Sequence, residues 1–429
     1  FNLFVGFEVL LAASFVLITL GGTHARVRSG TIYIVVSLAS SALFLLAIAA
    51  VYGATGTLNF AQLAQRLPEL PTQTATVLQL LLLVAFSVKA AVFPLSAWLP
   101  DSYPTAPAPV TAVFAGLLTK VGIYAIIRTQ SLLFPQHEIR DLLLWASILT
   151  MVVGILGAIA QSDIKRILSF TLVSHIGYML FGLAFSTELG YTGAIFYTIH
   201  HITVQTTLFL IAGLIEYRSG TTNLDRVGGL ARRAPVLAVL FFVPAMNLAG
   251  IPPFSGFIGK LGLLEAGVDA GDWLALLGVG AGVVTSLLTL YAMSKIWNRA
   301  FWQPFGEHEG DILDPHESQA IVGGSLHGSS GVSTSTKKES NWERLAAEQR
   351  MPLGMGIPTL MMAMVTVSLT VFAGPLMALS DRAAHEIADP NRYIHAVLCN
   401  PVGWDQSEAI LPRTQDVLDF CAEFKGASR

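Results

Sequence analysis

The stretch VLQLLLLVAFSVKAAVFPLSAWLP, residues 77–100, decides the fold of this protein. It is mainly apolar, carries one charged residue, Lys89, and is interrupted by Pro94. A helix of about 20 mainly apolar residues can cross a bilayer. Hydrocarbon offers no partner for free backbone groups, so a lipid-embedded segment of this length must be helical. The stretch therefore predicts a membrane-spanning helix with a buried cation and a proline break.

Ten stretches along the chain qualify as membrane spans in this way. They are residues 1–20, 31–52, 76–99, 108–128, 141–160, 167–185, 191–215, 236–266, 272–297 and 355–380. They are about twice as long as barrel strands and do not alternate apolar and polar residues, so strands are excluded. The sequence predicts an all-α, polytopic membrane helix bundle of about ten spans.

The composition agrees with a membrane protein. Of the 429 residues, 53% are hydrophobic and 12% are charged, whereas soluble domains carry roughly 25% charged residues. A net charge of −3 provides no basic face, so the lipid bilayer is an expected partner and nucleic acid is not. The two cysteines, Cys399 and Cys421, match no metal or redox spacing. They allow one disulfide, but two free thiols are the favoured interpretation.

Lysine and arginine fall mainly in one alternate set of loops, which predicts that these loops are cytoplasmic. The set contains Arg26, Arg28, Lys165, Arg166, Arg218, Arg226, Arg232, Arg233, Lys295 and Arg299. We expect a multi-pass protein of the cell inner (cytoplasmic) membrane. Within this set, Lys165 and Arg166 are interpreted as loop anchors, together with Asp163.

The chain divides into four parts. Residues 1–300 form the core of spans, residues 301–352 a flexible cytoplasmic linker, residues 353–380 the last span, and residues 381–429 a polar tail outside. The tail is expected either to dock on a neighbouring subunit or to lie in water. The first residue is Phe1, and the first span lacks the features of a signal peptide, so we expect the chain to begin inside a longer protein.

Four charged residues lie well inside predicted spans: Glu8, Lys89, Lys120 and Lys260. Each costs about 2.5–3.5 kcal/mol at the centre of a membrane helix and persists only when it is paired or hydrated. We interpret them as a proton or ion path, and structural ion pairs are the alternative. Burial favours the neutral form of a lysine, whereas a nearby carboxylate favours the charged form. A Glu8–Lys89 pair that opens and closes is therefore expected to switch Lys89 between protonation states.

Two spans are broken by proline, at Pro94 and at Pro252 and Pro253. Proline has no N–H, so Pro94 is expected to free the carbonyl of Ala90 close to Lys89. Broken helices at membrane depth are tolerated where they line a polar cavity, and they mark transport sites. An ordinary packing kink is the alternative for each. Lysine precedes proline in one break and follows it in the other, so the breaks alone indicate no internal repeat.

Polar side chains also interrupt two spans of the second half. His200, His201 and Gln205 lie in residues 191–215, with His201 and Gln205 one turn apart on the same face. Histidine titrates near neutrality and suits a proton relay, with satisfied interhelical hydrogen bonds as the alternative. His175, in the preceding span, is equally open to both interpretations. No cysteine or carboxylate accompanies the histidines, so no metal site is expected.

Nucleotide, haem and iron–sulfur motifs are not found in the sequence. We therefore expect no cofactor and no catalytic residue on this chain, and interpret it as a transporter subunit rather than an enzyme.

The motifs that hold these charges resemble the antiporter-like family shared by Mrp-type multisubunit Na+/H+ antiporters and the proton-pumping membrane subunits of respiratory complex I. The matching segments, in family order, are FNLFVGFEV (1–9), VKAAVFP (88–94), WLPD (98–101), APAPV (106–110), QSDIKR (161–166) and residues 250–260. The resemblance runs from Phe1 to about Ser380. The opening block, YGATGTLN (52–59) and YIHAVL (393–398) are most similar to the D subunits of Mrp antiporters.

The resemblance implies a fold of fourteen helices with two inverted repeats, each with a broken helix, and a proton route along a central hydrophilic axis. Glu8 and Lys89 match the family's Glu–Lys pair, Lys120 its lysine on the next helix, His201 its second-half histidine and Lys260 its terminal lysine. The chain departs from the family in two ways. It starts at the family's fifth helix, so about four helices are expected to be missing, and Gln205 stands where relatives commonly carry a central lysine.

The expected function is that of a proton-translocating subunit of a Na+/H+ antiporter, assembled with sibling antiporter subunits. One alternative is a proton-pumping membrane subunit of an NADH:quinone oxidoreductase. A non-conducting scaffold is another alternative, favoured if Gln205 breaks the lysine-to-lysine transfer.

Overall fold

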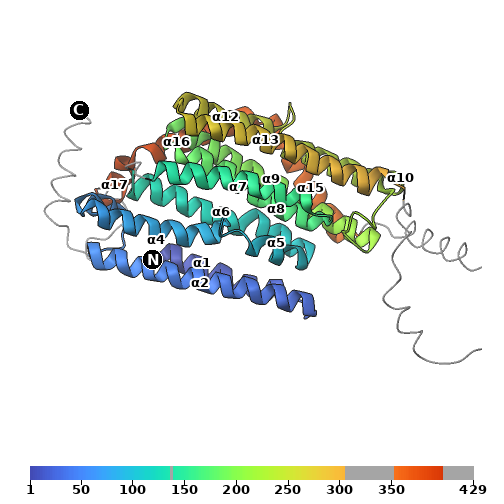
Figure 1. The fold of residues 1–429 in the computed structure, drawn as a ribbon, viewed down its shortest axis with the longest axis horizontal. Helices are drawn as coiled ribbons and strands as arrows, with labels where there is room; N and C mark the ends of the chain where they lie inside the picture. The colour runs from blue at the N-terminus through green and yellow to red at the C-terminus, as the bar shows by residue number, and fades with distance from the viewer. Residues whose placement is uncertain (136–138, 305–351, 400–429) are drawn as a thin grey trace, which may run out of the picture.

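The computed structural model describes residues 1–135, 139–304 and 352–399. Its regular elements are helices, and Figure 1 shows most of them running along the long axis of the molecule, from α1 and α2 on one side to α12 and α13 on the other. Within the described residues, one isolated bridge between Asp163 and Asn223 is the only strand-type pairing. The prediction of an all-α helix bundle is confirmed.

The longer helices set the architecture. They are α1 (Asn2–Thr19), α2 (His24–Thr55), α4 (Thr72–Ala90), α6 (Ala108–Leu133), α7 (Arg140–Ala160), α8 (Ile164–Ala184), α9 (Glu188–Ser219), α11 (Pro235–Ala249), α12 (Ser255–Ala270), α13 (Trp273–Ile296), α15 (Leu353–Val371) and α16 (Ala373–Ala388). The shorter elements are α3 (Phe60–Arg66), η1 (Leu67–Glu69), α5 (Trp98–Ser102), η2 (Tyr103–Thr105), α10 (Leu230–Arg233), the π-helical turn η3 (Trp297–Trp302) and α17 (Pro390–Leu398).

Among the described residues, nine helices are long and apolar enough to cross a membrane, against ten spans expected. The difference lies in residues 236–266, which form two shorter helices, α11 and α12, around the Pro252-Pro253 break. The expected single helix over residues 353–380 is wrong, because α15 ends at Val371 and α16 begins at Ala373. Pro375 has no N–H for the carbonyl of Val371, which explains this third interruption.

Helices α8 and α9 lie at the centre of the bundle. Almost all of α8 is buried, and α9 packs against α6, α8, α11, α12, α15 and α16. Two glycines of α6 allow its neighbours to approach closely. A side chain at Gly116 would collide with Thr206 of α9, and one at Gly122 would collide with Ala90 at the end of α4. The lysine-bearing part of α6 is thereby held against α9 and against the end of α4.

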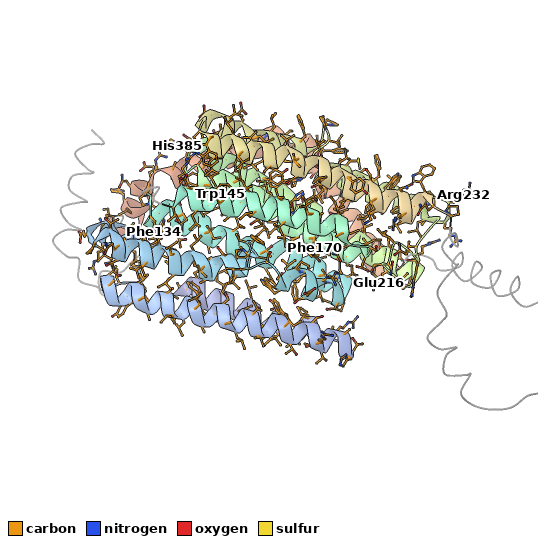
Figure 2. All side chains as sticks on the ribbon, viewed as in Figure 1. Phe134, Trp145, Phe170, Glu216, Arg232 and His385 are labelled. Carbon is orange, nitrogen blue, oxygen red and sulfur yellow. The ribbon has the colours of Figure 1, made fainter. Side chains whose placement is uncertain are left out.

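The basic loops gather at one end of the bundle, which we call the basic end. There, Lys165 pairs with Glu216 at 2.6 Å and Arg166 pairs with Asp101 at 3.1 Å. Figure 2 shows Glu216 and Arg232 at this end, and Phe134 and His385 at the opposite end. The two ion pairs join loops and helix ends, in agreement with the interpretation of Lys165 and Arg166 as anchors.

The start of the polar tail packs on its own bundle. Helix α16 lies against α9, where His385 contacts Glu188 at 2.9 Å. Helix α17 packs on α3, and the guanidinium of Arg128 lies 4.1 Å from the ring centroid of Tyr393. The start of the tail therefore packs partly on its own chain, and the alternatives of docking on a neighbouring subunit or lying in water stay predictions.

Cys399 is disulfide-bonded, so its interpretation as a free thiol is wrong. Sequence spacing does not reveal which thiols approach each other in space. The chain's other cysteine, Cys421, lies outside the described residues. So do residues 305–351, which make up most of the predicted linker, and residues 400–429 of the tail.

Candidate proton-relay site

The first break ends α4 directly after its lysine. Ala91 adopts a left-handed conformation with φ +60° and ends the helix three residues before Pro94. The sequence predicts a free carbonyl at Ala90, but the helix is already broken there. Trp98 beyond the break donates to the carbonyl of Val88 at 3.1 Å. Lys89 is therefore held in the last turn of a half-helix, where the helix dipole favours a cation.

Lys89 is buried, with 9% of its surface exposed. Its Nζ donates to Ser41 Oγ of α2 at 3.0 Å and lies 4.8 Å from the ring centroid of Phe7 on α1. Oε1 of Glu8 is buried without a hydrogen-bond partner. The described residues therefore show no ion pair between Glu8 and Lys89, and the opening and closing of this pair stays a prediction.

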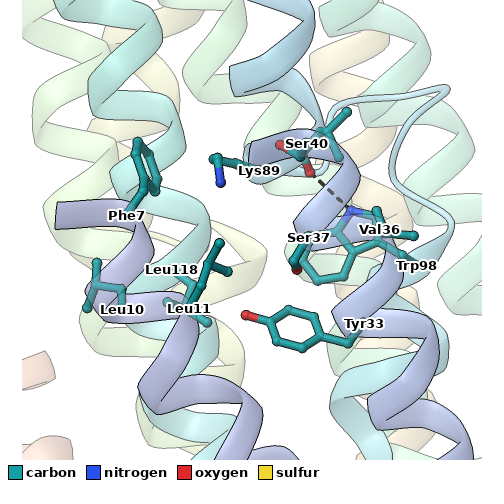
Figure 3. A pocket seen from close by; sticks show the side chains of 11 residues that line it. Phe7, Leu10, Leu11, Tyr33, Val36, Ser37, Ser40, Lys89, Trp98 and Leu118 are labelled. Carbon is teal, nitrogen blue, oxygen red and sulfur yellow. Dashed lines mark hydrogen bonds between the residues drawn. The ribbon is translucent and has the colours of Figure 1, made fainter. Parts of the chain in front are cut away.

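A small cavity of about 30 Å³ adjoins Lys89. It is lined by Phe7, Leu10, Leu11, Tyr33, Val36, Ser37, Ser40, Val88, Lys89, Trp98 and Leu118, and Figure 3 shows Lys89 between Phe7 on one side and Ser40 on the other. Because a buried water needs about 10–15 Å³ of such space, the cavity has room for two or three waters.

Lys120 of α6 is buried with 4% exposure, and its Nζ donates to the carbonyl of Ala115 at 2.6 Å. It lies near the end of α4, because Gly122 packs against Ala90. Helix α6 also packs against α8 and α9, which carry His175 and His201. Lys120 therefore stands between the lysine of the first break and the histidines.

Lys260 caps the half-helix α11. Its Nζ donates to the carbonyls of Leu248 and Ala249 at 3.0 and 3.1 Å, and to Ser286 Oγ of α13 at 3.0 Å. The C-terminus of a helix carries free carbonyls and partial negative charge, which stabilise a buried ammonium without a carboxylate. Gly250 at the break has φ +82° and lies close to Lys260. The second break thus builds the binding site of this lysine.

The three histidines lie between these lysines. His175 is contacted through Nδ1 by the hydroxyl of Tyr197 at 2.7 Å and through Nε2 by Thr289 Oγ1 at 3.3 Å. His200 Nδ1 lies 3.0 Å from Ser255 Oγ, at the start of α12. The ring of His201 lies 5.1 Å from that of His175. All three rings are fully buried.

His201 and Gln205 are incompletely satisfied. Neither ring nitrogen of His201 has a partner within the described part of the chain, nor does Oε1 of Gln205. The amide nitrogen of Gln205 donates to the carbonyl of Leu168 at 2.6 Å. Buried polar atoms without partners are rare and indicate bound water or a functional role. These unpaired atoms are therefore candidate positions for a bound water or a transferred proton.

The described part of the chain contains no ion pair that involves Glu8, Lys89, Lys120 or Lys260; its ion pairs lie elsewhere. For these four residues, the described part of the chain therefore does not contain the structural ion pairs of the alternative interpretation. Three buried cations instead use hydroxyls and helix carbonyls as partners, which solvate a charge without locking it to one counter-ion.

The comparison with known proteins agrees with this arrangement. The family described as NADH:quinone oxidoreductase/Mrp antiporter, TM, matches residues 1–289, more than half of the chain. The chain belongs to this family. The D subunit of a Na+/H+ antiporter from Alkalihalophilus pseudofirmus is 40% identical over 402 residues, 93% of this chain and 73% of the relative. The corresponding protein from Bacillus subtilis is 41% identical over 305 residues, 70% of this chain and 61% of the relative.

Solved structures of the family share the fold. A chain of the Mrp complex from Dietzia sp. DQ12-45-1b has a TM-score of 0.78 and 35% identity, covering 92% of this chain and 75% of that one. A chain of respiratory complex I from Thermus thermophilus has a TM-score of 0.70 and 25% identity, covering 90% and 74%. The predicted resemblance to the antiporter-like family is confirmed.

Sequence reasoning missed the neutral polar residues of the candidate proton-relay site. They are Ser41, Tyr178, Tyr197, Asn247, Ser255, Ser286 and Thr289. Each is a polar residue within or beside an apolar span, which is a weak signal, because many membrane-helix hydroxyls bond only to their own backbone. Their role depends on which helix faces them, and this emerges only from packing.

Proposed function

We propose that this chain is a proton-translocating membrane subunit of a multisubunit Na+/H+ antiporter. The observation that carries the proposal is a row of buried side chains on α4, α6, α8, α9 and α12 that have no ion-pair partner within the described residues: Lys89, Lys120, His175, His200, His201 and Lys260. Groups of this kind exchange protons through hydroxyls and water when no counter-ion fixes their charge. The 40% identity to an antiporter D subunit supports the choice of reaction.

In this proposal, protons move along the middle of the bundle. Glu8 and Lys89 form one end of the relay and Lys120 leads to the histidines. His201 and His175 form the centre, His200 stands beside Ser255, and Lys260 forms the other end. Tyr197 connects to His175 by a hydrogen bond. Water molecules bonded to the unpaired atoms of His201 and Gln205 would complete the path.

The basic end of the bundle is proposed to face the cytoplasm of a bacterial-type inner membrane, because basic loops are retained on that side. Sibling antiporter subunits are the proposed partners, and Na+ is the proposed counter-transported ion. A redox-driven proton pump is less well supported, since the complex I chain is 25% identical, against 40% for the antiporter protein.

The first test measures Na+-driven proton movement in inverted vesicles that carry the intact complex, with a pH-sensitive dye. Lys89→Ala and Lys260→Ala each remove one end of the relay, so we expect the initial rate to fall about tenfold or more, as for loss of a positioned proton-transfer group. Arg232→Ala is the control, because it removes an exposed charge at the basic end. Movement without any redox substrate would separate the antiporter from the redox-driven pump.

Gln205→Lys tests the scaffold alternative in the same vesicles. A conducting chain should respond to a second cation beside His201, whereas a scaffold should show no change with either Gln205→Lys or Lys89→Ala. If Lys89→Ala and Lys260→Ala complexes assemble normally and exchange ions at the rate of the unmodified complex, the proposed relay is wrong.

A further inference from the structure

The last long apolar helix, α15, contributes a side chain to the second break. We propose that Thr370 of this helix is a positioning residue of the relay. It holds the first turn of α12, so that Ser255 orients the ring of His200 and leaves Nε2 as the ring atom that exchanges a proton. This inference rests on the proposed function and adds a helix to it, because α15 lies beyond the residues that match the family, 1–289.

The first turn of α12 is capped by side chains from two other helices. The first N–H groups of a helix have no acceptor within that helix and need partners elsewhere. Phe254, the residue before α12, provides no side-chain cap. Instead, Thr370 Oγ1 of α15 accepts from the backbone N–H of Ser255 at 3.2 Å. Oδ1 of Asn247, on α11, accepts from the backbone N–H of Gly256 at 2.8 Å.

A contact between two hydroxyls fixes α15 on α9, the helix that carries His200. Helix α15 packs against α9 (Figure 1). Oγ1 of Thr366, one turn before Thr370, lies 3.2 Å from Oγ1 of Thr207 on α9, and both of these threonines are fully buried. Residues four apart lie on the same face of a helix. The face of α15 that contacts α9 therefore also carries Thr370 to the start of α12.

The ring of His200 is held by the first turn of α12. Its Nδ1 lies 3.0 Å from Ser255 Oγ, and the ring is fully buried. A Cβ at Gly256 would collide with the carbonyl of Asn247 and would lie 3.0 Å from Nε2 of His200, so this glycine allows the ring to approach the helix. A displacement of this turn would therefore move the ring or break its hydrogen bond.

The hydroxyl of Ser255 has three polar side chains around it, and a serine hydroxyl can donate once and accept twice. One arrangement satisfies all three. Thr370 Oγ1 donates to Ser255 Oγ at 3.4 Å, and Ser255 Oγ donates to Asn247 Oδ1 at 3.4 Å. The remaining lone pair of the hydroxyl accepts from Nδ1–H of His200. The free lone pair of the ring is then on Nε2.

Nε2 of His200 is buried and has no partner in the described part of the chain. It can take a proton on its lone pair from one group of the relay and release it to the next, while the bond from Nδ1 to Ser255 stays in place. Only the N–H bond at Nε2 forms and breaks, and the ring passes from neutral to cationic and back. The hydrogen bond at one ring nitrogen decides which nitrogen is free for this role. Thr370 thus affects proton transfer without touching the proton.

The test measures Na+-driven exchange by the intact complex in vesicles, in light water and in heavy water. Thr370→Val keeps the shape of the side chain and removes the hydroxyl. We expect the rate to fall about tenfold, as for other residues that orient a functional group. The ratio of the rates in light and heavy water should rise, because proton transfer at His200 then limits exchange. Thr370→Ser keeps the hydroxyl and should restore the rate to within about twofold of the original.

Thr359→Val is the matched control. Thr359 lies on the same helix and is fully buried, but its hydroxyl donates to the carbonyl of Met355 in its own helix at 2.7 Å. This change should alter neither the rate nor the isotope ratio. Ser255→Ala should lower the rate as Thr370→Val does. The double variant should be no slower than Ser255→Ala alone, because both changes act through the same hydroxyl.

The proposal is overturned if assembled Thr370→Val complexes exchange at the original rate or with the original isotope ratio. It is also overturned if Thr370→Ser is as slow as Thr370→Val, or if the losses from Thr370→Val and Ser255→Ala multiply. Thr370→Ala takes the place of Thr370→Val, with the same expected results, if the valine variant does not assemble. A Lys260→Ala complex that exchanges at the original rate would instead overturn the proposed function, whatever the result at Thr370.

Discussion

At the scale of single residues, Lys260 shows how a membrane protein stabilises a buried cation without a carboxylate. Its ammonium binds the free carbonyls that the second break exposes at the end of α11. This arrangement requires Gly250, whose φ of +82° is a conformation that other residues rarely adopt. A Cβ at this position would also lie 3.0 Å from Cδ of Lys260.

Gly250→Ala is therefore expected to lower both stability and exchange. Strain in the left-handed conformation costs about 1–2 kcal/mol, and contact with the lysine side chain should displace Nζ from the carbonyls. Thermal unfolding in detergent and Na+-driven exchange in vesicles check the two effects. Gly262→Ala is the control, because Gly262 lies within α12 and has open space around it. Equal behaviour of the two variants would contradict this role for Gly250.

At the scale of elements, the breaks end helices α4 and α11 next to the buried lysines Lys89 and Lys260. A few ion pairs hold neighbouring helices in place. Arg140 at the start of α7 pairs with Asp272, the N-cap of α13, at the end of the bundle opposite the basic end. The hydrogen bond from Arg140 holds the pKa of the Asp272 carboxyl below its usual value. Asp272 also accepts from the backbone N–H of Ala275 at 3.2 Å.

Asp272→Asn should remove the negative charge but keep the N-cap of α13, because asparagine is also a good N-cap residue. A carboxyl whose pKa is lowered by folding stabilises the folded state above its unfolded pKa of about 4, and that stabilisation disappears as the pH falls through the lowered value. We expect the variant to unfold at a lower temperature than the original protein at pH 7. The loss in free energy of unfolding should be less than about 1 kcal/mol, because this pair is partly exposed.

As the pH falls below about 4 and through the lowered pKa of Asp272, the two unfolding temperatures should converge, since the original carboxyl then becomes protonated as well. Asp269→Asn, at an exposed position near the end of α12, serves as the control and should change neither temperature. A difference that persisted unchanged in acid would show that the charge of Asp272 is not its cause.

At the scale of the whole molecule, charge is distributed between the two ends of the bundle. The basic end carries most of the arginines of the loops, whereas α16 and α17 close over α9 and α3 near the other end. Labelling of the intact protein can test which end of the bundle faces which side of the membrane.

Single cysteines at two exposed arginines should react from opposite sides of the membrane. In a background with Cys399→Ser and Cys421→Ser, we expect Arg382→Cys to react with an impermeant maleimide in intact cells. Arg232→Cys should react only after the membrane is permeabilised, because it lies at the basic end. Labelling of Arg232→Cys in intact cells, with protection of Arg382→Cys, would reverse the proposed orientation.

Most of the fold follows from the local chemistry of the chain. Spans such as 141–160 were predictable within a residue or two, because hydrophobic length and backbone hydrogen bonding act along a single segment. The third break was not predicted, although Pro375 was present as a signal. The ends of α2 and α9 also extend beyond the predicted spans, since helices continue past the apolar region into the loops.

In the candidate site, too, some features follow from the sequence and others only from the tertiary structure. Lys89, Lys120, Lys260 and the three histidines stand out in the sequence because a charge or imidazole within an apolar run is expensive to bury. By itself the sequence determined that this chain is a membrane helix bundle with titratable groups at depth. Only the tertiary structure decided which partners those groups have. Ser41 rather than Glu8 contacts Lys89, because which hydroxyl or carbonyl meets a lysine depends on the packing of helices far apart in the chain.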